Sequence, residues 1–378
     1  VLGVWHARGL TWPSNLRPNF EHSARRCLVN SKHLLWLLLL IPALAIMGCE
    51  GDAGPAGPAG PAGADGSDGS DGSDGSDGAS GTSVAVCLDC HSDAGLLQII
   101  NEYGMSGHNA GLYVDYAGGR ASCARCHGKQ GFIEYAVTGD VAGDIANPAA
   151  IDCATCHAVH PSEFALRLNG PVAWIGDAGY GDTSVDFGDN SNTCAECHQS
   201  RRAEPNISNP GDTFEITSTH YGPHHGAMAN VLAGALFAEI PGSMTYNGAS
   251  PHVGLGVTCV SCHMETYTEG TGGHSWWPNL ENCTGCHPSA TDFDIGGVQG
   301  DTQVLLDQLR DLLLDQGVIE WVEEDMAYEP IVGTYQMAQA QAFFNWIGLT
   351  EDRSLGVHNA PYVEALLTNS IEAITPAP

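Results

Sequence analysis

Apolar residues are distributed unevenly along this chain of 378 residues. A nearly unbroken apolar run covers residues 34–47, whereas residues 84–290 are rich in Gly, Asn, Asp and Pro and contain few long periodic apolar stretches. From residue 300 onward, apolar positions again recur with the spacing of helices. The pattern predicts an N-terminal leader, a loop-rich middle region and a helical C-terminal region.

The C-terminal region, residues 300–378, contains three amphipathic segments. A first helix is predicted from the apolar positions Val304, Leu305, Leu309, Leu312, Leu313 and Ile319, and it runs up to Trp321. A second covers residues 334–347, with Tyr335, Ala338, Ala342, Phe343 and Trp346 on one face. A third covers residues 361–371. We expect a helical hairpin packed against the middle region; the alternative is a separate helical domain that binds a partner.

The middle region, residues 84–299, predicts short helices, for example at 96–103 and 227–237, and otherwise loops. A segment of this composition buries too little aliphatic surface to fold alone, so it needs covalent or metal-based reinforcement. The expected fold is mainly α with extensive irregular loop.

Six Cys-x-x-Cys-His motifs lie in this middle region. They are numbered here in chain order as motif 1 (Cys87, Cys90, His91), motif 2 (Cys123, Cys126, His127), motif 3 (Cys153, Cys156, His157), motif 4 (Cys194, Cys197, His198), motif 5 (Cys259, Cys262, His263) and motif 6 (Cys283, Cys286, His287). Each is the attachment pattern of a c-type haem, in which two thiols form thioethers and the imidazole binds the iron.

Zinc sites, dithiol redox centres and disulfides also use Cys-x-x-Cys pairs. None of them requires a histidine directly after the second cysteine, yet all six pairs have one. We therefore expect six covalent c-type haems, closely spaced, which supply the core of a compact domain.

Six irons with one motif histidine each require six further axial ligands if every haem is closed. Eight other histidines follow residue 49: His108, His160, His220, His224, His225, His252, His274 and His358. We expect six of these eight to be distal ligands, leaving two that are non-ligands or that close a haem on a neighbouring molecule. Met ligation would raise the potential of a haem, and the alternatives of this kind are Met105, Met228, Met244 and Met264.

Some assignments follow from chain geometry. His160 is too close in sequence to His157 for both to bind opposite faces of one haem, so His160 is expected to serve a neighbouring haem. His224 and His225 are adjacent and point differently, so they would reach two haems, or one haem and solvent. His220 and His224 would share one face if their segment were helical.

The N-terminal region predicts export. Residues 29–49 resemble a lipoprotein signal peptide in which Cys49 is lipidated, with an ordinary signal peptide or an uncleaved anchor as alternatives. Residues 1–28 lack any such pattern and are expected to be an untranslated or non-structural extension. Residues 50–83 carry glycine at every third position, which is the collagen period; a flexible acidic stalk is favoured over a trimer because its aspartates repel one another.

The charge narrows the choice of partners. The whole chain has 13 basic and 44 acidic residues, a formal net charge of −31. Such a surface excludes nucleic acid and argues against an anionic membrane, so membrane contact would occur only through a lipid anchor. Basic redox proteins or cations remain as partners.

Three segments resemble exported multihaem c-type cytochromes of anaerobic, metal-reducing prokaryotes: residues 219–226, residues 259–264 with Gly273-His274, and residues 351–359. The resemblance covers about residues 84–372 and implies that His220, His224, His225, His274 and His358 are distal ligands. Some members of the group form extracellular filaments. The glycine-rich stalk after Cys49 resembles cell-surface decahaem metal reductases.

These features favour an electron carrier without bond chemistry, at the outer membrane or cell surface in anaerobic respiration. Its expected partners are other multihaem cytochromes, redox proteins, metal oxides or metal complexes, and self-assembly into filaments is an option. The alternative is an oxidoreductase of the nitrite reductase or hydroxylamine oxidoreductase type with one open haem. The chain lacks the Cys-x-x-Cys-Lys motif typical of the nitrite reductases.

Overall fold

The computed structural model describes residues 94–158, 164–176, 184–265 and 272–376. The chain divides into two units, residues 1–78 and 79–378, and every described residue belongs to the second. The predictions for the signal peptide, Cys49 and the stalk therefore lie outside the described residues.

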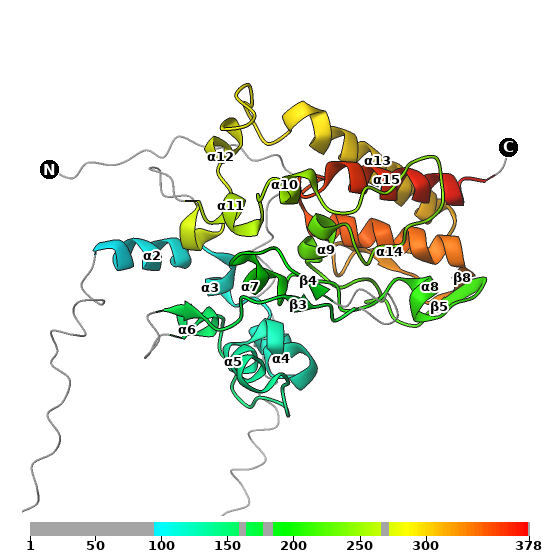
Figure 1. Ribbon diagram of the computed structural model, residues 1–378. Helices are drawn as coiled ribbons and strands as arrows, with labels where there is room; N and C mark the ends of the chain where they lie inside the picture. The colour runs from blue at the N-terminus through cyan, green and yellow to red at the C-terminus, as the bar shows by residue number, and fades with distance from the viewer. Residues whose placement is uncertain (1–93, 159–163, 177–183, 266–271, 377–378) are drawn as a thin grey trace, which may run out of the picture. The chain divides into compact units, whose positions relative to one another are not determined.

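The described part is rich in helices and loops, and its strands form small two-stranded sheets (Figure 1). Its N-terminal portion contains α2 (Ala94–Gly104), α3 (Gly107–Ala110), the π-helical turn η2 (Val114–Gly118), α4 (Ala121–His127), α5 (Lys129–Thr138), α6 (Cys153–Cys156), β1 (His157–Ala158) and β2 (Ala165–Leu166). The helix expected at residues 96–103 is confirmed by α2.

Short helices and short strands, joined by loops, continue to residue 297. They are β3 (Val172–Ala173), β4 (Ser184–Val185), α7 (Ser191–Ala195), α8 (Pro205–Ser208), β5 (Thr213–Ile216), α9 (Met228–Ala233), α10 (Pro251–Gly254), α11 (Cys259–His263), η3 (Gly273–Ser275), α12 (Leu280–Thr284) and η4 (Ile295–Gly297). The helix expected at 227–237 is shorter than predicted, because Gly234 adopts a left-handed conformation and ends α9.

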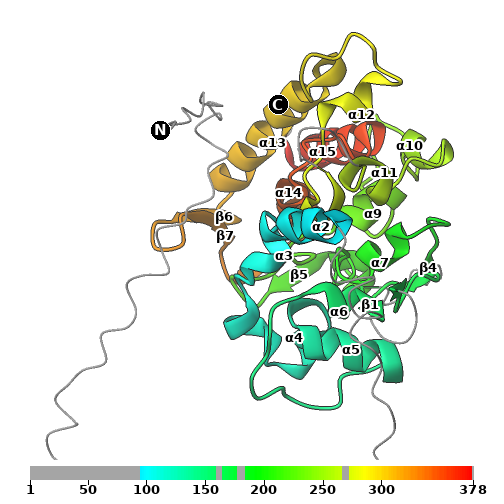
Figure 2. The same cartoon turned by 90° about the vertical axis from the view of Figure 1, so that its left-hand side faces the viewer.

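The C-terminal portion consists of α13 (Val298–Asp315), β6 (Ile319–Val322), β7 (Ala327–Pro330), β8 (Gly333–Gln336), α14 (Met337–Asp352) and α15 (Ala360–Ile374). The three predicted helices are confirmed, and they pack on one another at the end of the molecule away from α4 and α5 (Figure 2). The strands between them were not predicted.

Two boundaries were wrong. Ile319 and Trp321 belong to β6 and not to the first helix, because Gly317 takes a positive φ of 66° that ends the helical path. Thr334 and Tyr335 belong to β8 and not to the second helix. β8 pairs antiparallel with β5, Phe214 facing Tyr335, and this pairing ties the C-terminal helices to the middle region.

The aliphatic and aromatic core is concentrated around the C-terminal helices. Fully buried side chains there include Leu309 and Leu313 of α13, Phe343 and Phe344 of α14, and Leu366 of α15. Among the described residues before position 166, by contrast, the buried hydrophobic residues are only Ala117, Ala124, Phe132 and Val141. The N-terminal portion thus has little apolar core of its own.

Asn345 locks the helices onto the middle region. Its side chain donates to the Ala238 carbonyl at 2.8 Å and to Ser370 Oγ at 3.0 Å, and its Oδ1 accepts from the Ala238 amide at 2.9 Å. Because Asn345 is fully buried, these bonds satisfy polar groups that would otherwise be costly. The helices and the middle region therefore form one continuous structure in the described part of the chain.

Removing a core side chain of α13 should destabilise the protein. Leu309→Ala leaves a cavity at a fully buried position and should lower the free energy of unfolding by about 2–5 kcal/mol. Val304→Ala on the same helix is the matched control, since Val304 is 65% exposed, and should change it by less than about 0.5 kcal/mol. Chemical denaturation followed by circular dichroism measures both; equal effects would contradict the described packing of α13.

Candidate functional site: a set of facing histidines

Motifs 2 to 6 lie among the described residues, and each contributes to a short helix or turn. α4 contains motif 2, α6 and the first residue of β1 carry motif 3, and α11 contains motif 5. One helical turn brings residues i, i+3 and i+4 to the same side. The two thiols and the imidazole of a motif therefore face one direction, as attachment to a single planar group requires.

Local capping explains why these helices begin at the motifs. Asp152 caps α6 through a capping box with Thr155, and Thr258 does the same for α11 with Ser261. Each box satisfies backbone amides that the first turn leaves without partners. Capping thus sets the position of the first cysteine in both motifs.

Four motif histidines each face another histidine that is distant in sequence. The ring centroids of the four pairs lie 5.9 Å apart for His127 and His224, 6.2 Å for His157 and His274, 6.1 Å for His108 and His198, and 6.3 Å for His263 and His358. In all four pairs the partner belongs to the spare histidines counted from the sequence.

These separations fit an iron between the two rings. Metal–imidazole nitrogen bonds are about 2.0 Å long, so two imidazoles that face each other across one metal have ring centres about 6 Å apart. Direct packing of two rings would also fall in this range, but packing alone explains neither the recurrence nor the adjacent Cys-x-x-Cys pair in each case. The residues present therefore fit covalent haems with two histidine ligands.

The four histidines that face motif histidines come from different parts of the fold. His108 lies in α3 and His274 in η3, whereas His358 lies in the loop between α14 and α15. His224 lies in a non-helical segment with a positive φ of 89°, so the conditional prediction of a helix face shared by His220 and His224 does not apply.

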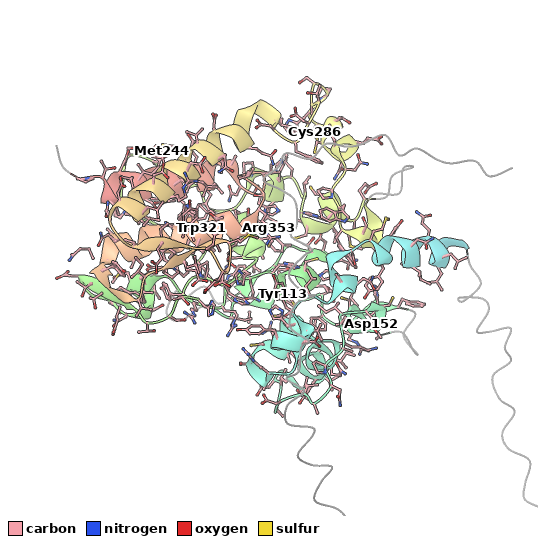
Figure 3. All side chains as sticks on the ribbon, turned by 180° about the vertical axis from the view of Figure 1, so that it is seen from behind. Tyr113, Asp152, Met244, Cys286, Trp321 and Arg353 are labelled. Atoms are coloured by element: carbon pink, nitrogen blue, oxygen red, sulfur yellow. The ribbon has the colours of Figure 1, made fainter. Side chains whose placement is uncertain are left out.

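His252, in α10, is near the histidine of motif 6. Burial lowers the pKa of His252, and His287 adds to the lowering through its charge. His287 and Cys286 are both exposed, and Figure 3 shows Cys286 at the top of the molecule. Motif 6 is thus the most open of the described motifs.

The other candidates differ. His220 is exposed, and His225 has 79% of its side chain exposed and pairs with Glu351 at 2.5 Å. Neither is paired with a motif histidine in the described part. His160 and the whole of motif 1, Cys87, Cys90 and His91, lie outside the described residues.

Electrostatics favour neutral imidazoles at most of the paired sites. Burial is the main cause that lowers the pKa of His198, to about 4, and of His224, to about 3, and neighbouring imidazoles or arginines add to both shifts. The neutral ring is the form that binds metals. His358 differs: burial lowers its pKa, but the Asp352 carboxylate outweighs burial and the pKa is raised.

Motifs 2 and 4 pack against each other reciprocally. Cys126 Sγ lies 3.8 Å from the Glu196 carbonyl, and Cys197 Sγ lies 3.9 Å from the Arg125 carbonyl. The Arg125 guanidinium forms an ion pair with the Glu196 carboxylate, and these residues occupy the same position in their motifs. The two attachment segments therefore contact each other reciprocally through equivalent positions.

Motif 4 also contacts motif 5. Ser191 Oγ and Thr258 Oγ1 are 2.9 Å apart, and Thr258 donates to Asp189 at 2.6 Å. Ser191 Oγ also accepts from the amide of Val260, inside motif 5, at 3.0 Å. These bonds hold the starts of the two motifs together.

Motif 5 continues to motif 6, because Asn282, directly before Cys283, donates to the Ser261 carbonyl. Motifs 2, 4, 5 and 6 thus form a contiguous series in space, although their chain order skips motif 3.

Motif 3 contacts the segment after motif 2, and the histidine that faces motif 3 contacts a tryptophan near motif 5. Lys129, which follows motif 2, pairs with Asp152 at 2.6 Å directly before Cys153. Trp276 lies next to two of the facing histidines, with its ring 5.6 Å from that of His274 and 4.6 Å from that of His108. Trp276 therefore connects the histidine that faces motif 3 with the histidine that faces motif 4.

Three residues that organise the site were not predicted from the sequence: the Arg125–Glu196 pair and Trp276. Arg125 and Glu196 have opposite charges at equivalent positions of their motifs, which the sequence shows. That pattern indicates an ion pair only once the contact between the two motifs is known. Trp276 gave no signal beyond its proximity to His274 in the sequence.

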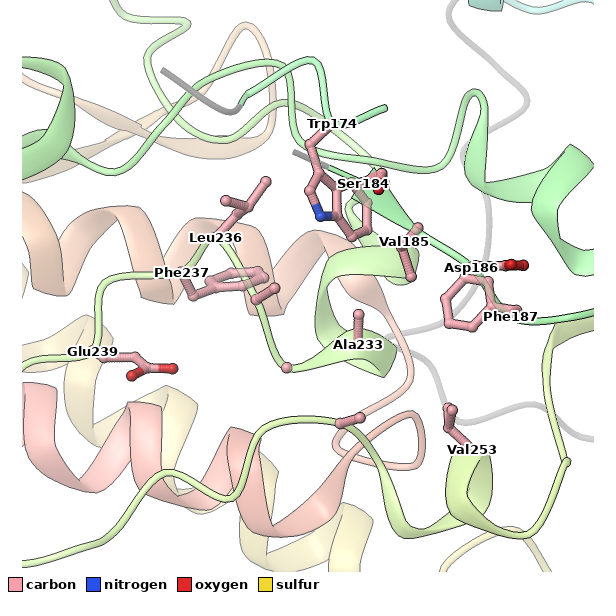
Figure 4. Close-up of a pocket in the computed structure, with 13 residues that line it drawn as sticks. Trp174, Ser184, Val185, Asp186, Phe187, Ala233, Leu236, Phe237, Glu239 and Val253 are labelled. Carbon is pink, nitrogen blue, oxygen red and sulfur yellow. The ribbon is translucent and has the colours of Figure 1, made fainter. Parts of the chain in front are cut away.

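The described part also contains an apolar pocket of about 520 Å³, lined by side chains such as Trp174, Phe187 and Leu236 (Figure 4). No cysteine or histidine lines it. It is separate from the paired histidines, and we assign it no role in haem binding.

Within the described residues, no helix is long and apolar enough to cross a membrane. Neither a protein-family model nor a curated protein sequence matches the chain.

Three solved structures with similar folds are cytochromes. The outer cell wall cytochrome OcwA shares 18% identity over 72% of this chain and 50% of its own, with a TM-score of 0.47. The undecahaem cytochrome from the S-layer of Carboxydothermus ferrireducens shares 19% identity over 72% of this chain and 40% of its own, with a TM-score of 0.44. The chain spans at most half the length of these two proteins.

The third is the cytochrome c nitrite reductase of Desulfovibrio desulfuricans, which shares 17% identity over 68% of this chain and 65% of its own, with a TM-score of 0.38.

Breaking the contact between motifs 2 and 4 should be costly. The side chains of Arg125 and Glu196 are only 17% and 8% exposed, so Arg125→Met should leave a buried carboxylate unpaired and lower the free energy of unfolding by about 3–5 kcal/mol. Replacing both residues by apolar ones should recover most of that loss.

The control for this pair is Arg310→Met, which breaks the more exposed Arg310–Asp307 pair on α13 and should cost less than about 1 kcal/mol. Denaturation midpoints of the haem-loaded variants measure both effects. An Arg125 variant as stable as the Arg310 variant would contradict a stabilising Arg125–Glu196 pair between motifs 2 and 4.

Preventing haem attachment should unfold one portion of the chain selectively. Because residues 94–165 have few buried hydrophobic residues, the chain made without haem should exchange its amide hydrogens rapidly there, whereas α13, α14 and α15 should remain protected. Hydrogen exchange with mass spectrometry of haem-free and haem-loaded chains measures this. Equal protection of both portions without haem would contradict haem as the core of the N-terminal portion.

Proposed function

We propose that this protein is a hexahaem c-type cytochrome that transfers electrons across or outside the cell envelope, without substrate bond chemistry. The observation that carries the proposal is the set of four histidine pairs at 5.9–6.3 Å, each next to a Cys-x-x-Cys pair. When bound, haem supplies a reversible one-electron change at the iron. The chain's own residues hold, space and insulate these groups.

The proposed distal ligands are His224 for motif 2, His274 for motif 3, His108 for motif 4, His358 for motif 5 and His252 for motif 6. His160 is proposed for motif 1, because its neighbour His157 already faces His274. His220 and His225 are then the two histidines in excess, which agrees with their exposure in the described part. On this assignment the four methionines considered as alternatives are not needed.

Electron transfer is favoured by the contacts between motifs. Thioethers join each haem to its motif, so the contacts of Cys126 Sγ with the Glu196 carbonyl and of Cys197 Sγ with the Arg125 carbonyl support closely spaced haems. With two protein ligands on an iron, no position is left for a substrate. The series of motifs 2, 4, 5 and 6 therefore favours a relay over a catalytic centre.

The acidic surface and the expected signal sequence favour a location outside the cytoplasm. Lipidation of Cys49, tethering at the outer membrane and assembly into filaments are further proposals that rest on the sequence. Cationic redox partners or metal complexes suit the net charge of −31.

An oxidoreductase with an open haem is the second candidate. Its open position would belong to motif 6, whose histidine is exposed, or to motif 1. On the proposed assignment, a distal imidazole would occupy the position of a substrate in the other four motifs. This restricts the alternative to two of the six haems.

Electron paramagnetic resonance with a redox titration tests the proposal, after mass spectrometry has counted the haems. The exported protein should carry six haems, all low-spin and insensitive to nitrite and hydroxylamine. A high-spin haem that changes when nitrite is added would overturn the relay in favour of the oxidoreductase.

Single substitutions test the ligand assignment in the same samples. His274→Ala should convert one low-spin haem to high-spin, because its distal ligand is lost, whereas His225→Ala should leave all spectra unchanged. The reverse result would reassign both histidines.

A further inference from the structure

A buried carboxylate contacts one of the proposed distal ligands. Asp352 is the last residue of α14, and its side chain is 1% exposed. Its Oδ1 lies 2.7 Å from Nδ1 of His358 and accepts the hydrogen bond when that nitrogen carries the proton. The other ring nitrogen of His358 is then free to bind an iron.

The chain between these two residues is shaped to make this contact. Arg353 and Leu355 have positive φ values of 61° and 50°, and Gly356 has 90°. A Cβ at Gly356 would lie 2.6 Å from Thr302 Oγ1, so this position requires glycine. The tight loop therefore returns the chain from the end of α14 onto itself, and Figure 3 shows Arg353 at this turn.

Further bonds fix the carboxylate and the loop. Ser354 Oγ donates to Asp352 Oδ2, so the carboxylate is held at both oxygens. Asn359, directly after His358, donates to the carbonyls of Val231 and Gly248 at 3.0 and 2.9 Å. Strained backbone that is held in this way commonly marks a functional position.

The opposite ligand of the same pair is also hydrogen-bonded. His263 Nδ1 lies 2.9 Å from the carbonyl oxygen of Trp276, to which it donates. Trp276 itself has a positive φ of 55°. Both imidazoles of the motif 5 pair are thus oriented through Nδ1, which leaves the other nitrogen of each ring toward its partner.

The carboxylate sets this pair apart from the other three. In the described part, His157 Nδ1 contacts the Phe164 carbonyl, which is neutral. The second histidine ring with a carboxylate partner in the described part is that of His225, which is exposed and belongs to none of the pairs. The buried Glu102 carboxylate accepts from the backbone amide of His274, not from its ring. His358 is therefore the one imidazole of the four described pairs with an anionic hydrogen-bond partner.

A carboxylate that accepts the Nδ1 proton raises the basicity of a metal-bound imidazole. A more basic ligand and a buried negative charge both favour ferric over ferrous iron, since reduction adds one electron and removes positive charge. We propose that Asp352 is a positioning residue that lowers the reduction potential of the motif 5 haem below those of the haems in the other three described pairs. The inference rests on the proposed function.

The low potential would affect electron transfer because motif 5 lies between two other motifs. Motif 5 contacts motif 4 on one side and motif 6 on the other. A haem of low potential there stays oxidised at rest and separates electrons held near motif 4 from those held near motif 6. Asp352 would thus control how electrons are distributed along the series.

Asp352→Asn in the full-length haem-loaded protein tests this inference. Asparagine keeps the size and an acceptor oxygen but removes the charge, so one haem should become at least tenfold easier to reduce, an upward shift of about 59 mV or more for one electron. All haems should remain low-spin, because His358 still binds. Spectroelectrochemical titration and electron paramagnetic resonance give both readouts.

Glu351→Gln is the matched control. It removes the same charge one residue earlier, from a carboxylate that pairs with the exposed His225, and should shift no haem by as much as tenfold. If Asp352→Asn shifts no potential, or if both variants shift the same haem equally, the specific role of Asp352 is overturned.

A measurement on the unmodified protein covers the case in which Asp352→Asn fails to assemble. Near-infrared magnetic circular dichroism reports axial-ligand basicity, and one low-spin haem should give a charge-transfer band displaced from the others. Identical bands for all haems would overturn the inference even if six low-spin haems are found. A high-spin haem sensitive to nitrite would instead overturn the proposed function, so the two failures are distinguishable.

Discussion

The sharing of one iron by two imidazoles, as proposed above, is the constraint on which the described structure would depend. It requires ring centres about 6 Å apart, and four pairs satisfy it although their members are far apart in the sequence. On the proposed ligation, each such link would close a long loop, and its covalent and coordinate bonds would offset the entropy lost on closure, much as a disulfide does. A loop-rich chain can adopt one structure because these links replace the secondary structure it lacks.

The two portions of the described chain differ in what stabilises them. The C-terminal helices bury a conventional apolar core, with Leu309, Phe343 and Leu366 at its centre. The described N-terminal portion has almost none, so on the proposed ligation its order would depend on the haems that its thiols and imidazoles hold. Because His358 and Asp352 lie at the end of α14, the conventional core also positions one member of a haem-binding pair. The stability of the helical portion thus fixes the positions of His358 and Asp352.

Much of this organisation could be predicted from local sequence. The motifs identify the attachment residues, and helical periodicity finds α13, α14 and α15. Periodicity failed at Ile319 and Trp321, where a left-handed glycine ends the helix and a short hairpin begins. A short amphipathic strand next to a helix offers too few residues to distinguish the two periods.

The pairing of histidines could not be predicted in the same way, because it depends on contacts between remote segments. Counting gave eight candidates for six positions, and only the three-dimensional arrangement separates His224, which faces His127, from the adjacent His225. The same holds for Asp352. In the sequence it is one of 44 acidic residues, and no local pattern distinguishes it from Glu351.

Location decides what each of these charges can do. Carboxylates on the surface are screened by salt over about 8–10 Å, so together they govern solubility and the choice of cationic partners but act weakly on any single iron. Asp352 is enclosed by protein and bonded at both oxygens, where the effective dielectric constant is lower and the interaction with a nearby charge correspondingly larger. One buried carboxylate can therefore change the potential of a single haem, although the surface carries dozens of other carboxylates. The structure thereby separates two properties that net charge alone would link: which partners the protein attracts, and where along its series of haems an electron rests.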